Sequence, residues 1–108
     1  MIRAMSKYEN DYIYIYSIYK NDSDFYYLAS SATHQGLLVY KDIEIYNIEV
    51  LSSNYIKLNT FDISATSDDQ MHPILFSFLK NDWETYEGII EGQNDSWLEF
   101  QRKLGHRP

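Results

Sequence analysis

A chain of 108 residues, of which 44% are hydrophobic and 23% are charged, can bury one hydrophobic core and is too apolar to remain disordered. The absence of cysteine excludes a disulfide framework, a thiolate metal site and a cysteine nucleophile. The net charge of -7 argues against direct binding of nucleic acid, because contacts to phosphates need clustered Lys and Arg side chains.

The amino-terminal segment contains no signal for export. Residues 1–7 lack the apolar stretch of a secretory signal, and no apolar run approaches the ~18 residues of a membrane span. We therefore expect a cytoplasmic protein that does not interact with membranes. Either Met1 or Met5 could be the native start, and we assign residues 1–4 no role.

The clearest strand of the sequence is formed by residues 12–19, which are almost all β-branched or aromatic. Alternate side chains of a strand share a face, so Ile13 and Ile15 are expected to point into the core. The opposite face carries a row of tyrosine rings, Tyr12, Tyr14 and Tyr16. This row is expected either to pack beneath helices or to form an exposed recognition surface.

Four further segments have strand-like composition. Residues 20–24 form a polar turn, so residues 25–29 are expected to complete a hairpin with the first strand. Three more strands are expected at residues 37–40, 43–51 and 55–63, each bounded by polar residues. About five strands at such short spacing predict an antiparallel meander.

The last third of the sequence changes to helical periodicity. Pro73 suits the first turn of a helix, although residues 74–80 could also form a sixth strand. Residues 82–92 predict a helix with acids in its first turn, and residues 97–104 predict another that is capped from within residues 94–96. The predicted fold is one α+β domain spanning the chain, an antiparallel meander of about five strands followed by two or three C-terminal helices packed on one face.

Sequence motifs for catalysis are absent. The chain contains no nucleophile elbow, Walker loop, zinc-protease motif or dinucleotide fingerprint, and its four glycines are too scattered to cradle phosphates. Asp68, Asp69 and His72 could hold a metal ion or form an acid–base pair. The simpler interpretation is that Asp68 or Asp69 caps the helix that follows. We therefore expect a protein that is not an enzyme and needs no metal or cofactor.

The acidity of the last third is its second distinctive feature after the tyrosine row. Five acids and no Lys or Arg occur between Trp83 and Gln101. On one continuous helix the acids at positions 87, 91, 95 and 99 would form a single stripe of like charge, which costs stability. A helix break near Gly92 would scatter this stripe.

We expect the acidic segment and its aromatic neighbours to bind a basic protein. Charge would steer the encounter, and the aromatic rings would hold the complex. The tyrosine row is the second candidate surface. The expected partner-binding residues are Trp83, Glu84, Tyr86, Glu87, Glu91, Asp95 and Trp97, together with Tyr12, Tyr14 and Tyr16.

A short acidic chain with 11 Tyr, 5 Phe and 2 Trp, no cofactor motif and no export signal resembles the small bacterial immunity proteins of contact-dependent and polymorphic toxin systems. The resemblance lies in overall character. It implies direct binding to a basic toxin, such as a nuclease, which the bound protein would neutralise. Three other hypotheses stay open: a phage-type inhibitor that mimics nucleic acid, a sugar or small-ligand module that uses the tyrosine row, and a purely structural subunit.

Overall fold

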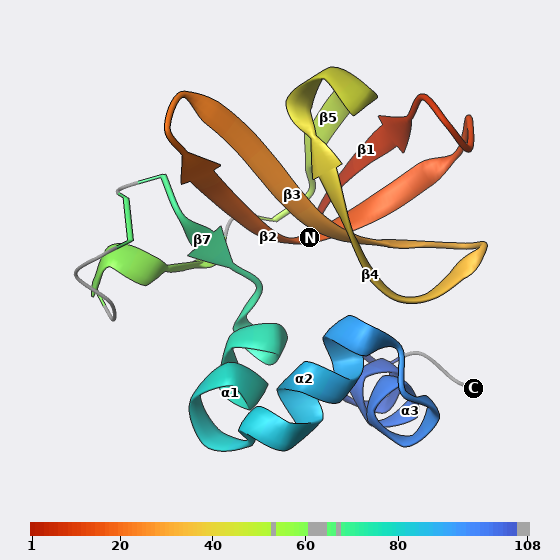
Figure 1. Cartoon of the computed structure of the whole chain (residues 1–108), viewed down its shortest axis with the longest axis vertical. Helices are drawn as coiled ribbons and strands as arrows, with labels where there is room; N and C mark the ends of the chain where they lie inside the picture. Colours follow the sequence, from red (N-terminus) through yellow and green to blue (C-terminus); the bar gives the residue numbers. More distant parts are fainter. Residues whose placement is uncertain (53, 61–64, 67, 106–108) are drawn as a thin grey trace.

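The computed structural model describes residues 1–52, 54–60, 65, 66 and 68–105. In Figure 1 a strongly curved antiparallel sheet lies over a layer of helices, which confirms the predicted α+β class. The described strands are β1 (Ile2–Ser6), β2 (Tyr12–Asn21), β3 (Asp24–Ser31), β4 (His34–Lys41), β5 (Ile45–Val50), β6 (Ile56–Lys57) and β7 (Gln70–Met71). The described helices are α1 (Pro73–Asn81), α2 (Trp83–Glu91) and α3 (Asn94–Lys103), with short 3-10 turns η1 (Asp42–Glu44) and η2 (Leu58–Thr60).

The strands of the sheet follow the order β4-β3-β2-β1-β5. The first four strands therefore form a meander, after which β5 returns to the far side of β1. Strand β2 pairs with β3 along one edge and changes its partner along the other edge. Its first half pairs with β1, and beyond a register shift between Ile15 and Ser17 it pairs with β7.

The predicted hairpin is formed by β2 and β3. Lys20 pairs with Phe25 and Asn21 pairs with Asp24 at its closed end. Asp22 lies in the turn with φ at 58°, a left-handed conformation that Asp and Asn adopt more readily than most residues. The turn therefore needs no glycine.

The buried side chains form two apolar clusters on opposite faces of the sheet. Ile13 and Ile15 are fully buried in the first cluster, as predicted, together with Ala4 and Ala29. Tyr16, the next residue of β2, belongs to the second cluster, because consecutive strand residues point to opposite faces. This second cluster contains the buried side chains of the helices, Leu75, Phe78, Ile89 and Phe100.

Part of the tyrosine excess belongs to the core. Among the described residues, Tyr16, Tyr27, Tyr40 and Tyr55 are buried. The Tyr55 hydroxyl donates to the carbonyl oxygen of Ile15 at 2.6 Å. The Tyr27 and Tyr40 hydroxyls reach carboxylates near the surface, those of Asp42 at 2.9 Å and Glu9 at 2.8 Å. A large aromatic ring can thus be buried here because its polar end is satisfied.

The expectation that residues 1–4 have no role was wrong. Ile2 and Ala4 are buried, and their strand β1 lies between β2 and β5. Their alternation with Arg3 and Met5 spans only a few residues and includes a small side chain, which is too short a pattern to predict a strand.

The segment after β5 also differs from the prediction. Instead of a strand over residues 55–63, β6 contains only two residues and η2 follows it; residues 61–63 lie outside the described part of the chain. The connection expected over residues 64–70 ends in β7, which pairs with both β6 and β2. The strand-like composition did not account for these short pairings.

Helix α1 begins at Pro73, as predicted, but neither Asp68 nor Asp69 caps it. The cap is His72, whose Nδ1 accepts a hydrogen bond from the backbone N–H of Ile74 at 3.1 Å. Asp69 turns toward the sheet, where its carboxylate accepts the backbone N–H of Lys20 at 2.8 Å. With Pro73 at the first helical position, only the residue directly before it occupies the cap position.

Helix α2 is one residue shorter at each end than the predicted range of residues 82–92, whose first and last residues are its caps. The Asp82 carboxylate accepts the backbone N–H of Thr85 at 3.2 Å, and Gly92 ends the helix with φ at 75°. Helix α3 begins at Asn94, three residues earlier than expected, and Gln93 precedes it without a side-chain cap. The break at Gly92 confirms that the acids of the last third do not form one continuous stripe.

Candidate functional site

Helix α2 presents an exposed acidic face formed by Glu84, Glu87 and Glu91. Their spacings of three and four residues place the three side chains on one side of the helix, and all three are exposed. No ion pair between described residues involves any of these carboxylates. The acidic face therefore carries negative charge that the described part of the protein does not neutralise.

A shallow pocket of about 350 Å³ lies beside the acidic face, and we call it the socket. Strands β2 and β3 contribute Tyr19 and Leu28, and α2 contributes Tyr86 and Ile90. Glu87 and Glu91 complete its lining, so an aromatic and aliphatic surface adjoins two carboxylates.

The rings around the socket are held by their neighbours. Tyr19 stacks on Tyr26 with a centroid separation of 5.5 Å and an interplanar angle of 14°. Trp83, which is 57% exposed, lies 5.3 Å from Tyr86. Burial raises the pKa of Tyr19 and of Tyr86, so both phenols stay neutral at physiological pH. The aromatic part of the socket is thus uncharged, and the charge of its lining comes from Glu87 and Glu91.

Asp95 belongs to α3 and does not line the socket. It lines a separate shallow pocket on α3 with Leu98, Glu99 and Arg102. The Arg102 guanidinium donates to the Glu99 carboxylate at 2.6 Å, which neutralises that acid locally. Of the four predicted partner-binding acids, Glu87 and Glu91 therefore line the socket and Asp95 lines another pocket.

The tyrosine row is divided between core and surface. Tyr16 is 1% exposed and packs edge-on against Phe100, with ring centroids 5.0 Å apart. Burial raises the pKa of Tyr16 to about 12. Tyr12 and Tyr14 remain accessible. The row is therefore packed beneath a helix at one end and accessible at the other, because α3 covers only the end that contains Tyr16.

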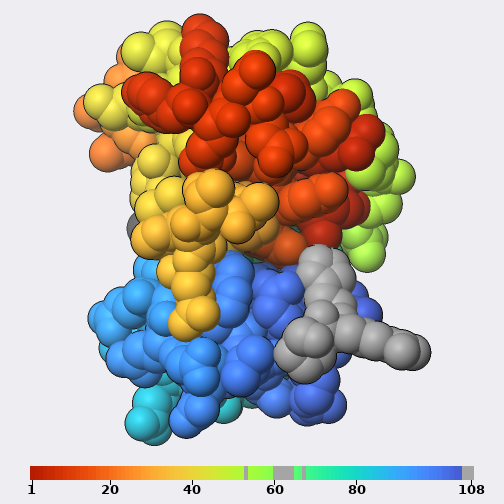
Figure 2. Space-filling model, turned by 90° about the vertical axis from the view of Figure 1, so that its right-hand side faces the viewer, coloured from red at the N-terminus to blue at the C-terminus, as the bar shows by residue number. Residues whose placement is uncertain are grey.

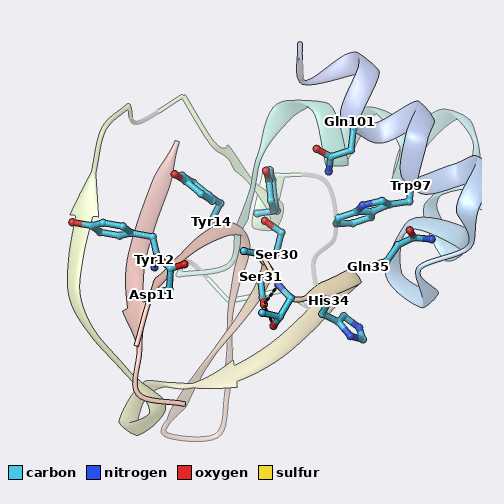
Figure 3. Close-up of a pocket in the computed structure, with 12 residues that line it drawn as sticks. Asp11, Tyr12, Tyr14, Ser30, Ser31, His34, Gln35, Trp97 and Gln101 are labelled. Carbon is cyan, nitrogen blue, oxygen red and sulfur yellow. Dashed lines mark hydrogen bonds between the residues drawn. The ribbon is translucent and has the colours of Figure 1, made fainter. Parts of the chain in front are cut away.

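Tyr12 and Tyr14 line a groove of about 670 Å³, the larger of the two binding candidates. Figure 3 shows these rings on one side of the groove, with Trp97 of α3 on the opposite side. Figure 2 looks onto this side of the molecule, where the gold β3–β4 turn reaches from the sheet down to the blue helices. The groove is lined by Asp11, Tyr12, Tyr14, Tyr16, Ser30, Ser31, Ala32, Thr33, His34, Gln35, Trp97 and Gln101.

Hydrogen bonds fix the walls of the groove. In the β3–β4 turn, the Ser31 and Thr33 hydroxyls lie 3.0 Å apart. The Gln35 amide donates to the carbonyl oxygen of Gly92 at 2.8 Å and so ties the turn to the end of α2. The sequence does not predict the polar residues of the groove, because isolated Ser, Thr and Gln residues form no motif.

The proposed metal or acid–base trio is not assembled. The His72 ring lies between Tyr16 and Tyr55, with centroids 5.5 and 5.4 Å away, and Asp69 faces Lys20 instead. Burial lowers the pKa of His72 to about 4, so the ring is neutral at pH 7 and serves as the α1 cap. Over the described residues, no three His, Asp or Glu side chains gather in a way that could hold a metal ion.

No family model matches this chain, and no curated protein or solved structure matches it either. None of the helices in the described part of the chain is long and apolar enough to cross a membrane.

Proposed function

We propose that this protein is a non-catalytic inhibitor of the immunity type, which binds a basic toxin domain and thereby neutralises it. The observation that carries the proposal is the placement of Glu84, Glu87 and Glu91, without ion-pair partners among the described residues, beside an aromatic socket.

The acidic face is suited to attract a basic protein. Carboxylates three and four residues apart on a helix repel one another, so their spacing costs the free protein stability. Cationic side chains of a basic partner would attract these carboxylates and so offset their mutual repulsion in the complex. The net charge of -7 adds a long-range attraction, which raises the association rate with basic proteins at low salt.

The socket is suited to one long cationic side chain of such a partner. Lys and Arg bury the aliphatic part of the side chain against apolar surfaces while the charged end stays near water. In the socket, Ile90 and Leu28 would contact the aliphatic part, and Glu87 and Glu91 would pair with the charge. Trp83 and Tyr86 add the kind of aromatic contact that slows dissociation of protein complexes.

The test needs a candidate toxin domain, which is sought among the genes that flank the gene for this chain. The domain and the protein are expressed together, and growth protection is recorded with association rates at several salt concentrations. The double reversal Glu87→Lys and Glu91→Lys should slow association by about 10-fold or more and flatten its salt dependence. Protection should fall accordingly.

The matched control is the double variant Asp24→Lys and Asp95→Lys, which makes the same change in net charge at other exposed positions. If the acidic face docks the toxin, this control should retain most of the association rate. Equal losses in both variants would show that only total charge matters. An unchanged rate after reversal of Glu87 and Glu91 would contradict the proposal. Circular dichroism establishes that each variant is folded.

A further inference from the structure

We propose that the groove between β2, the β3–β4 turn and α3 binds a short, neutral oligosaccharide. The groove and the socket share no lining residue, so this site is independent of the surface assigned to the toxin. Its volume of about 670 Å³ falls within the range of small-molecule sites in proteins.

The aromatic rings on opposite walls suit the faces of a sugar ring. Tyr14 is 38% exposed, and Trp97 is half-buried across the groove from it (Figure 3). The C–H groups on one face of a sugar carry slight positive charge, whereas the face of an aromatic ring is negative. Two separated rings can therefore contact two sugar units of one chain.

The polar residues suit the edges of a sugar ring. Each sugar hydroxyl can both donate and accept a hydrogen bond, and the groove offers hydroxyl, amide and carboxylate groups that do one or both. Gln35 donates its amide to Gly92, which leaves the oxygen of that amide as an acceptor. These hydroxyl, amide and carboxylate groups belong to Asp11, Ser30, Thr33 and Gln35.

The groove's composition distinguishes a neutral sugar from other ligands. Among the described residues, its lining contains no Lys or Arg and has one carboxylate, Asp11. The Arg3 guanidinium lies 4.1 Å from the Tyr12 ring but is paired with Glu49, so phosphates and acidic sugars would meet a carboxylate and no unpaired cation. The part of the lining that the structure describes also contains no Leu, Ile, Val or Met, whereas the centres of protein interfaces are usually apolar. The groove combines aromatic rings with mostly neutral polar groups, and this combination suits a neutral sugar better than the other ligands.

The groove is also organised before any ligand binds. Tyr16 beneath it is packed against Phe100, and the Ser31–Thr33 contact and the Gln35–Gly92 bond hold the turn. A site that is already ordered loses less conformational entropy on binding, which matters for a ligand whose individual contacts are weak.

Trp97 provides a direct reporter of binding. The chain has 2 Trp, so the variant Trp83→Phe leaves Trp97 as the single tryptophan. This protein is titrated with cellotetraose, maltotetraose and chitotetraose, and with tetragalacturonate as an acidic control. At least one neutral tetrasaccharide should change Trp97 fluorescence saturably, with a Kd near or below about 1 mM, and the acidic one should not.

Substitutions at Tyr14 establish where the sugar binds. In the Trp83→Phe background, Tyr14→Ala should weaken binding at least 10-fold, as expected for loss of one stacking ring (about 1.4 kcal/mol per factor of ten). Tyr14→Phe, which keeps the ring, should bind nearly as well. Tyr8→Ala is the matched control, because Tyr8 is 71% exposed and lies outside the groove.

Three results would overturn the proposal: no saturable change up to about 10 mM of any neutral tetrasaccharide, equal binding of tetragalacturonate, or equal binding by Tyr14→Ala. A fourth would be that Tyr14→Ala weakens only the toxin complex, which would assign the groove to the protein partner. Reversal of Glu87 and Glu91 should leave sugar binding unchanged, so failure of the toxin proposal and failure of this one are distinguishable.

Discussion

Gly36 on β4 and Gly92 at the end of α2 meet backbone to backbone. A Cβ atom on Gly36 would lie 2.8 Å from the Cα of Gly92, and one on Gly92 would collide with the carbonyl oxygen of Gln35. This approach joins the helical layer to the sheet and brings α3 to the wall of the groove.

The first prediction concerns this contact. Gly36→Ala should lower the free energy of unfolding by about 2 to 4 kcal/mol, because φ at 104° strains an alanine and the added carbon meets the backbone of Gly92. Gly105→Ala is the matched control, with φ at 85° and nothing within 4 Å of its added carbon. It should cost only about 1 to 2 kcal/mol from strain. Equal losses in urea unfolding would show that close approach contributes nothing.

The second prediction concerns the core beneath β1 and β3. Ile15 is fully buried, so Ile15→Ala should destabilise the protein by about 2 to 5 kcal/mol through lost burial and a new cavity. Ile43→Ala serves as control, because Ile43 is 75% exposed and its truncation should change stability by less than about 0.5 kcal/mol. Chemical denaturation measures both. A change within error for Ile15→Ala would contradict the assigned strand face.

The third prediction concerns the amino-terminal strand. A protein that begins at Met5 lacks Ile2 and Ala4, two members of the first core cluster, and loses most of the β1 pairing with β2 and β5. It should unfold at much lower temperature than the full chain or fail to fold cooperatively. Calorimetry compares the two proteins. Equal melting temperatures would show that β1 is dispensable.

The fourth prediction concerns His72 and pH. Its pKa is lowered from 6.5 to about 4 by burial, so the unfolded chain binds a proton at a pH where the folded chain does not. Its contribution to stability is therefore complete above about 6.5 and is lost as pH falls toward 4. We expect a loss of about 1 to 2 kcal/mol, since the ring is only half-buried and solvent screens part of the cost of charging it.

The clearest window for this measurement is above pH 4.5. Hydrogen bonds from Tyr8 and Arg102 hold the pKa values of Glu44 and Glu99 below 4.5, so their contributions are lost only at lower pH. His72→Asn keeps a capping side chain that does not titrate and should flatten the stability profile between pH 6.5 and 4.5. A profile unchanged by this substitution would assign the pH dependence to other groups.

What the sequence determined by itself is local. The alternation of β-branched and aromatic residues predicted β2, its hairpin with β3 and the burial of Ile13 and Ile15, because these depend on neighbours along the chain. The limits of α2 were likewise readable from Asp82 and Gly92, which supply the cap and the left-handed stop within the segment itself.

Only the tertiary structure decided which of these side chains meet. Tyr16 is buried and Tyr14 is exposed, although both lie in one row, because Phe100 of a helix far along the chain covers the first and not the second. The socket likewise joins Tyr19 of β2 to Tyr86 of α2. Such contacts depend on how the sheet curves and where the helices dock, and no spacing within one segment encodes either.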